Sequence, residues 1–130
     1  MEQDLLFLTE TALRISGVDP KKCMKCGKCS GACPNYDAME YHPHQFVSMV
    51  EKGQILKLME SDAIYLCLSC MACVERCPRH VAPGRLVGAV AQMKLRRQGG
   101  NRKNGNDLAA IADENMPQQL LVAAMRKYRK

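Results

Sequence analysis

Eight cysteines, the whole cysteine content of this 130-residue chain, fall into two short runs with the same spacing. The first run is CMKCGKCSGACP and the second is CLSCMACVERCP, so each has the form C-x2-C-x2-C-x3-C-P. Each cysteine of the second run lies 44 positions after its counterpart in the first. Thiolates bind iron–sulfur clusters and zinc, so the pattern indicates a metal-binding protein. The candidate ligands are Cys23, Cys26, Cys29 and Cys33 in the first run, and Cys67, Cys70, Cys73 and Cys77 in the second.

This spacing is typical of proteins that hold two [4Fe-4S] clusters. Three thiolates so close in sequence can reach three corners of one cubane only when the chain wraps tightly around it, and the fourth thiolate must come from elsewhere. In two-cluster proteins the cysteine before the proline ligates the other cluster. We therefore predict that one cluster is bound by Cys23, Cys26, Cys29 and Cys77, and the other by Cys67, Cys70, Cys73 and Cys33.

Two other uses of cysteine fit the sequence less well. Structural zinc needs four ligands, commonly two C-x2-C pairs, which would leave half of these cysteines without a role. A disulfide framework is typical of short secreted chains, but the N-terminal segment contains Glu2 and Asp4 and has no signal-peptide pattern. No apolar run approaches the roughly 20 residues that span a bilayer. We expect a soluble, cytoplasmic protein without a membrane span.

The formal net charge of +6 overstates the basic character of the cluster-loaded chain. A cubane with its four thiolates carries about −2, so two clusters lower the total to about +2. The closing RKYRK segment has no accompanying recognition motif, and we predict no binding to nucleic acid. Cations flank both runs, where they either raise the reduction potentials or form a solvated rim that steers a partner. They are Lys21, Lys22, Lys25, Lys28, Arg76, Arg79 and Arg85.

Helical periodicity dominates the rest of the chain, and strand signals are weak. Residues 2–17 form a predicted amphipathic helix that ends at Gly17, and we expect it to cover one of the clusters. Residues 85–98 form a second predicted helix with a basic last turn. The apolar face of this helix consists of Leu86, Val90 and Met93.

The segment between the two runs also has helical signals. Pro43 suits the first turn of a helix that Gly53 stops. Residues 55–60 form another short helix, and Ser61 or Asp62 can cap a third that leads into the second run. We expect these helices to bury Phe46, Val47, Val50, Leu56 and Met59.

The predicted organisation is an N-terminal helix (residues 1–17), a two-cluster domain (18–98) and a linker with a C-terminal tail (99–130). The tail is either a docking helix for a partner or a weakly ordered extension. The scarcity of large aromatic residues suggests that the clusters replace part of a conventional core, so the iron-free chain should be loosely folded at best. The histidines are His42, His44 and His80. We favour surface or capping roles for them over proton transfer beside a cluster.

The chain resembles the small iron–sulfur subunit of heterodisulfide reductases. The resemblance rests on KCMKCGKCSGACP, on ESDAIYLCLSCMACVERCPR and on the basic helix that follows, and it covers residues 18–97. It implies an all-α fold, an α-helical ferredoxin-like domain packed around two [4Fe-4S] clusters. It also implies a complex in which a flavin-containing subunit passes electrons through the small iron–sulfur subunit to a third, CCG-type subunit, which acts on a disulfide.

We find no catalytic triad, phosphate-binding glycine loop or flavin motif in the chain, and every cysteine is assigned to a cluster. The predicted function is therefore a one-electron relay inside such a complex, without catalysis by this chain alone. A free two-cluster ferredoxin and the iron–sulfur subunit of another dehydrogenase complex are the alternatives. A regulatory or structural metal module is a further one.

Overall fold

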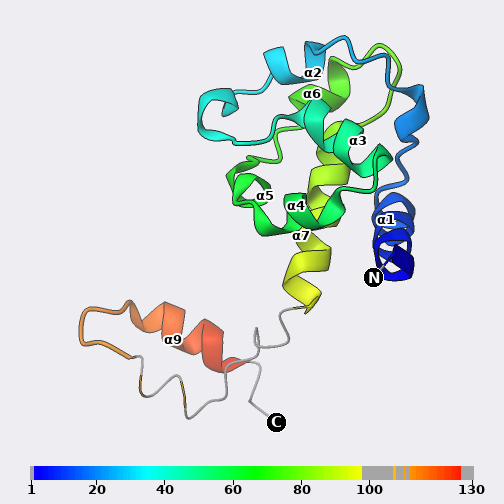
Figure 1. The fold of residues 1–130 in the computed structure, drawn as a ribbon. Coiled ribbons are helices and arrows are strands. Elements are labelled where there is room, and N and C mark those ends of the chain that lie inside the picture. Colours follow the sequence, from blue (N-terminus) through cyan, green and yellow to red (C-terminus); the bar gives the residue numbers. More distant parts are fainter. Residues whose placement is uncertain (1, 98–106, 108–109, 111, 127–130) are drawn as a thin grey trace. The chain divides into compact units, whose positions relative to one another are not determined.

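The structure is a computed structural model that describes residues 2–97, 107, 110 and 112–126 (Figure 1). It contains helices and no strand among these residues, which confirms the predicted all-α class. None of the helices described could span a bilayer, given their length and polarity. The chain divides into two units, residues 1–97 and 98–130. The first unit comprises α1 (Glu2–Ser16), η1 (Pro20–Lys22), α2 (Lys28–Gly31), η2 (Tyr36–Ala38), α3 (Pro43–Glu51), α4 (Ile55–Glu60), α5 (Ala63–Leu66), α6 (Ala72–Glu75) and α7 (Pro83–Arg97).

Helix α7 is the element on which the first unit is assembled. It contacts α1, α3, α4, α5 and α6, and Figure 1 shows it passing between the other helices. Its buried face repeats at helical spacing through Leu86, Val90 and Met93, as predicted. Burying a side chain of this size contributes about 1.5–3 kcal/mol, so these positions hold the unit together. The opposing α3 and α4 supply the fully buried Phe46, Val47, Val50, Ile55 and Leu58.

Helix α1 ends at Gly17, which adopts a left-handed φ of 66° that favours glycine. Leu8 and Ala12 are buried, and the helix packs against α7 and α4. No residue of α1 lines either of the cysteine pockets described below. The prediction that this helix covers a cluster is therefore wrong, because its apolar face is used on the helical core instead.

The linker helices lie close to their predicted positions. Helix α3 begins at Pro43 after His42, whose backbone N–H donates to Gln45 Oε1 at 2.8 Å. The His42 ring stacks on Tyr36, and its Nδ1 has no hydrogen-bond partner among the described residues. Helix α4 has the predicted bounds, but Leu56 is 41% exposed. Met59 is buried as predicted, together with its neighbours Ile55 and Leu58, so Leu56 is the one position of this face that was predicted wrongly.

The third linker helix, α5, is preceded by Ser61, whose Oγ accepts a hydrogen bond from the N–H of Ala63 at 3.1 Å. The same hydroxyl donates to Glu40 Oε2 at 2.8 Å, so Ser61 ties α5 to the loop that follows the first run. Ser61 thus performs the predicted cap, and α5 leads directly into Cys67.

Helix α7 begins two residues earlier than predicted, at Pro83. Proline suits the first helical position, where its missing N–H would have had no partner within the helix. The early start puts Gly84 in the first turn, beside the second cysteine run. In the second unit, α9 (Gln118–Met125) follows Pro117. The predicted linker at residues 101–107 lies largely outside the described residues.

Candidate metal centres

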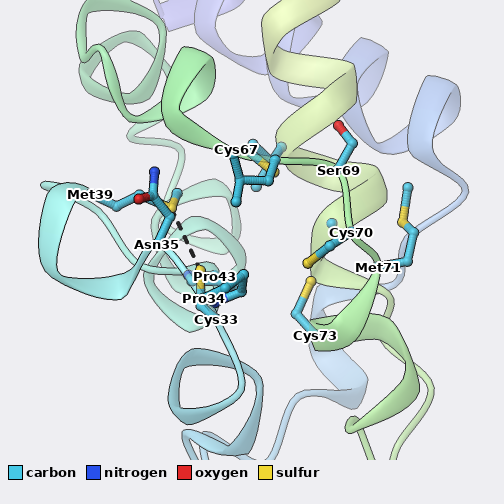
Figure 2. A pocket seen from close by; sticks show the side chains of 13 residues that line it. Cys33, Pro34, Asn35, Met39, Pro43, Cys67, Ser69, Cys70, Met71 and Cys73 are labelled. Carbon is cyan, nitrogen blue, oxygen red and sulfur yellow. Dashed lines mark hydrogen bonds between the residues drawn. The ribbon is translucent and has the colours of Figure 1, made fainter.

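The eight cysteines gather around two pockets in the first unit. The pocket called here the Cys67 pocket is lined by Cys67, Cys70, Cys73 and Cys33 (Figure 2). The Cys23 pocket is lined by Cys23, Cys26, Cys29 and Cys77. Each pocket therefore receives three cysteines from one run and its fourth from the other run, in the same groups that the spacing predicts for two clusters.

The two runs adopt matching local structures. The third cysteine of each, Cys29 in α2 and Cys73 in α6, is buried, whereas the second, Cys26 and Cys70, is exposed. Helices α2 and α6 are in contact and lie side by side at one end of the unit (Figure 1). Each pocket is thus closed on the side of its third cysteine and open to solvent at its second.

Left-handed backbone turns bring the three cysteines of each run around one pocket. Lys25 and Ser69, which precede the exposed cysteines, have φ of 57° and 53°. Gly27 and Met71, which follow them, have φ of 74° and 59°. Such a conformation costs about 1–2 kcal/mol for a residue other than glycine. Strain of this kind concentrates at functional sites, and successive turns of this type direct N–H groups toward a bound anionic group.

The fourth cysteine of the Cys67 pocket is held by contacts between the two runs. Asn35 Nδ2 donates to the carbonyl oxygen of Leu66 at 2.7 Å, which ties the end of the first run to the residue before Cys67. Cys33 Sγ also lies 3.8 Å from Met39 Sδ. Figure 2 shows Cys70 and Cys73 turned toward one another, with Cys33 on the other side of the view.

The fourth cysteine of the Cys23 pocket accepts a backbone hydrogen bond. The N–H of Val81 donates to Cys77 Sγ at 3.3 Å. The flanking His80 and Ala82 have left-handed φ of 53° and 61°, so the chain turns sharply around this sulfur. Hydrogen bonds to cluster sulfurs are one of the means by which a protein raises reduction potential.

Gly84 lies against the Cys67 pocket where a larger residue would not fit. A Cβ at this position would lie 3.1 Å from Cys73 Sγ and 3.3 Å from Met71 Sδ. The missing side chain lets the first turn of α7 approach the cysteine, whose sulfur interacts with the Gly84 N–H. This close backbone approach is the kind of cradle that a cluster with its thiolates requires.

Burial opposes ionisation of the innermost thiols. Burial raises the pKa of Cys73 to about 11, against the opposing effect of the Gly84 N–H. Burial also raises the pKa of Cys29, against hydrogen bonds from Ser30. Without a metal these thiols are protonated at neutral pH, whereas bound iron supplies the positive charge that keeps thiolates deprotonated.

The arrangement of the thiols fits a cubane better than a single ion. Within the described residues, no three Cys, His, Asp or Glu side chains lie close enough together to hold one metal ion. Zinc would draw its sulfurs to about 3.8 Å from one another, given tetrahedral geometry and Zn–S bonds of about 2.3 Å. A [4Fe-4S] cluster binds each thiolate at a separate iron, so four thiols spread around a pocket suit it.

His44 is the histidine that lines a cysteine pocket, the Cys23 pocket. The backbone N–H of His44 donates to Ser30 Oγ at 3.2 Å, and the same hydroxyl lies 2.6 Å from His44 Nδ1. Burial, and then the nearby His42, lower the pKa of His44, so the ring is neutral at physiological pH. The surface or capping role expected for this histidine does not describe its position.

Sequence reasoning therefore missed three contributors to the pockets, which are Asn35, Gly84 and the Ser30–His44 pair. The Gly84 position has a local signal, since a Pro-Gly pair opens the helix that follows the second run. The contacts of Asn35 and His44 have no signal in the local sequence, because their partners lie far along the chain.

Comparison with known proteins agrees with this geometry. Residues 19–81 match the family model of a 4Fe-4S dicluster domain, a span that contains all eight cysteines. Such a domain holds two 4Fe-4S clusters. The match thus indicates two [4Fe-4S] clusters as the cofactor, and the two cysteine pockets fit them.

Curated relatives are similar to part of this chain. An "H(2)/formate:CoB-CoM heterodisulfide,ferredoxin reductase" subunit from Methanococcus maripaludis is 31% identical over 91 residues, which cover 70% of this chain and 48% of the relative. A "Ferredoxin:CoB-CoM heterodisulfide reductase" subunit from Methanosarcina mazei is 33% identical over 81 residues, covering 62% of this chain and 47% of the relative. The iron–sulfur subunit of a "CoB--CoM heterodisulfide reductase" from Methanopyrus kandleri is 34% identical over 68 residues, covering 52% and 34%. The chain thus spans less than half the length of these relatives.

Proposed function

We propose that this chain is the electron-transfer subunit of a heterodisulfide-reductase-like complex, because residues 19–81 match a 4Fe-4S dicluster domain and the chain is similar to heterodisulfide reductase iron–sulfur subunits. The observation that carries the proposal is the pair of pockets, each with three cysteines from one run and one from the other. In this proposal Cys23, Cys26, Cys29 and Cys77 ligate one cluster, and Cys67, Cys70, Cys73 and Cys33 ligate the other.

The residues of the chain hold, shield and present the two clusters, which when bound each accept and return one electron. Burial of Cys29 and Cys73 excludes water from the inner side of each pocket. The exposed Cys26 and Cys70 leave one edge of each pocket open to a partner. Contact between α2 and α6 keeps the pockets close together, as a relay requires. We propose that the chain alone is not catalytic, because all eight of its cysteines line the two pockets assigned to clusters.

The partners follow from the resemblance to the iron–sulfur subunits of heterodisulfide reductases. A flavin-containing subunit would donate the electrons, and a CCG-type subunit that reduces a disulfide would receive them, in the cytoplasm. Strictly anoxic affinity isolation from the native cell, with identification of stoichiometric companions, tests this assignment. Co-purification of a flavoprotein and a CCG-type protein is the expected result. Isolation of the chain alone, with both clusters bound, would instead identify a free two-cluster ferredoxin.

The ligand assignment is tested by serine variants of the crossing cysteines. Cys33→Ser should alter the spectrum of the cluster bound by the second run, and Cys77→Ser that of the cluster bound by the first. Mössbauer and EPR spectroscopy of anoxically prepared protein, compared with Cys70→Ser and Cys26→Ser as references for each cluster, make the distinction. If Cys33→Ser reproduces the spectrum of Cys26→Ser, the proposed crossing is wrong.

A further inference from the structure

The two halves of the cluster domain repeat one another beyond the cysteines. Pro83 and Val87 of α7 lie 40 positions after Pro43 and Val47 of α3. Pro43 and Val87 line the Cys67 pocket, whereas Pro83 and Val47 line the Cys23 pocket. Residues at equivalent positions of the two halves thus line different pockets, as expected if a pseudo-two-fold axis relates the halves. The repeat makes it possible to compare the two pockets position by position.

Charge is the first difference between equivalent positions. Lys25 and Arg79 line the Cys23 pocket, and their counterparts 44 positions away, Ser69 and Asn35, line the Cys67 pocket. Lys25 and Ser69 share the same left-handed backbone, with φ of 57° and 53°, so the chain has the same course at both places. The difference therefore lies in the side chains, with cationic groups at one pocket and neutral groups at the other.

Hydrogen bonding to the buried cysteines is the second difference. Ser30, next to Cys29, is buried at 3% exposure and hydrogen-bonds to the Cys29 sulfur through its side chain and backbone. Its position is fixed by the contacts with His44, at 2.6 Å and 3.2 Å. The equivalent residue beside Cys73 is Val74, which has no hydroxyl group to offer.

Two other features affect the pockets equally or weaken the contrast. Backbone N–H groups interact with cysteine sulfurs in both pockets, for example from Val81 in one and Gly84 in the other, so these two bonds do not separate the pockets. Lys25 Nζ lies 3.9 Å from Glu51 Oε2, which offsets part of its charge. Exposed charges are also screened by solvent and salt. Arg79 is therefore the clearest residue with which to test the contrast.

We propose that the two clusters have unequal reduction potentials and that the cluster of the Cys23 pocket has the higher one, because Lys25, Arg79 and Ser30 occupy positions where the Cys67 pocket has neutral or apolar residues. Reduction adds one negative charge to a site that is already negative. Nearby cations and hydrogen-bond donors favour that change. The first electron would therefore go to the cluster bound in the Cys23 pocket, and electrons would pass from a donor at the Cys67 pocket to an acceptor at the Cys23 pocket.

This inference rests on the proposed electron-transfer function and is tested by exchanging equivalent residues. An EPR-monitored redox titration of the anoxic full-length chain with both clusters should show two one-electron transitions. We expect at least a tenfold preference for reducing one cluster first, which corresponds to about 59 mV for one electron. Arg79→Asn should lower the higher of the two midpoint potentials and leave the lower one in place.

The reciprocal change uses Ser69→Lys, which should raise the lower midpoint potential and narrow the gap. It is preferred to a substitution at Asn35, whose amide holds the Leu66 carbonyl. Lys57→Gln serves as the control, since Lys57 is an exposed cation of α4 that lines neither pocket. This control should move neither potential beyond the small effect of a remote charge.

Three results would overturn the inference. They are two equal midpoint potentials in the natural chain, a shift of the lower potential in Arg79→Asn, or equal shifts in Arg79→Asn and Lys57→Gln. Failure of the proposed function is different, because a chain that binds no pair of clusters shows no two one-electron transitions at all. Iron and sulfide analysis before the titration separates these two failures.

Discussion

Substitution of Gly84 by alanine tests the close approach of α7 to the Cys67 pocket. The added Cβ would lie 3.1 Å from Cys73 Sγ, 3.3 Å from Met71 Sδ and 3.5 Å from Val74 Cγ2. Carbon atoms in favourable contact are about 3.5–4.0 Å apart. When Cys73 is bonded to iron its sulfur cannot retreat, so the first turn of α7 must move. Overpacking of this kind costs about 1–3 kcal/mol.

Alanine also has an advantage over glycine in a helix, worth about 0.5–1 kcal/mol. The net effect of Gly84→Ala in the cluster-loaded chain is therefore a loss of about 1 kcal/mol, within a range of about 0–2.5 kcal/mol. In a domain of this size each 1 kcal/mol shifts the melting temperature by about 4–8 °C. The matched control is Gly88→Ala in the same helix, where nothing lies within 4 Å of the new Cβ. Gly88→Ala should therefore only gain the higher helix propensity of alanine and raise the melting temperature, whereas Gly84→Ala should lower it.

The assay is anoxic thermal unfolding followed by far-UV circular dichroism and, in parallel, by the visible absorbance of the clusters. Iron and sulfide analysis shows whether Gly84→Ala loses one cluster before the other. The result that refutes the reasoning is a Gly84→Ala protein that is stabilised as much as Gly88→Ala and retains both clusters. Cys73 Sγ would then have room to move, and the close approach would not depend on glycine.

Two further predictions concern the iron itself. Loss of iron to a chelator should slow as pH rises through the neutral range, because the pKa of Cys73 in the iron-free pocket is about 11 and binding must displace its proton. The direction of this pH dependence follows because iron binds the thiolate form of cysteine. Protons compete with iron for the sulfur, so acid favours iron release. Anoxic removal of the iron should abolish cooperative thermal unfolding, because cluster binding replaces part of the core. Calorimetry of the iron-free chain checks this.

The outcomes that contradict these two predictions are equally direct. A rate of iron loss that does not change with pH would mean that the buried thiols do not control release. Reconstitution of the iron-free chain with iron and sulfide should restore its cooperative unfolding transition, which controls for irreversible damage during iron removal. A cooperative calorimetric transition in iron-free protein would show that the helices around Phe46 and Leu86 suffice to hold the fold.

Features that depend on near neighbours in the chain were accessible from the sequence. The spacing of the cysteines predicted that Cys33 joins the second run and Cys77 the first, and the structure places the side chains in these groups. Ligation itself stays a prediction. Helix α4 has the predicted bounds, and α3 begins at the predicted proline. Periodicity, proline and glycine act over a few residues, so they can be interpreted without the tertiary fold.

Features that depend on distant contacts were not accessible. The amide of Asn35 meets a carbonyl group 31 positions away, and the approach of Gly84 to Cys73 depends on where α7 begins. The placement of α1 was predicted wrongly because amphipathicity shows that a helix face is buried but does not identify the surface that covers it. The contrast between Arg79 and Asn35 also required the structure, which shows that each lines a different pocket.

The exchange of one cysteine between the pockets also has a consequence for how the protein is made. The Cys67 pocket has four thiols only after Cys73 has left the ribosome, and the Cys23 pocket only after Cys77, although the first run emerges 44 residues before the second. Iron delivered to the nascent chain would meet an incomplete set of ligands. Insertion of a complete cluster must therefore wait for most of the second run, and a chain truncated before Cys73 should hold no complete cluster even though its first run is intact.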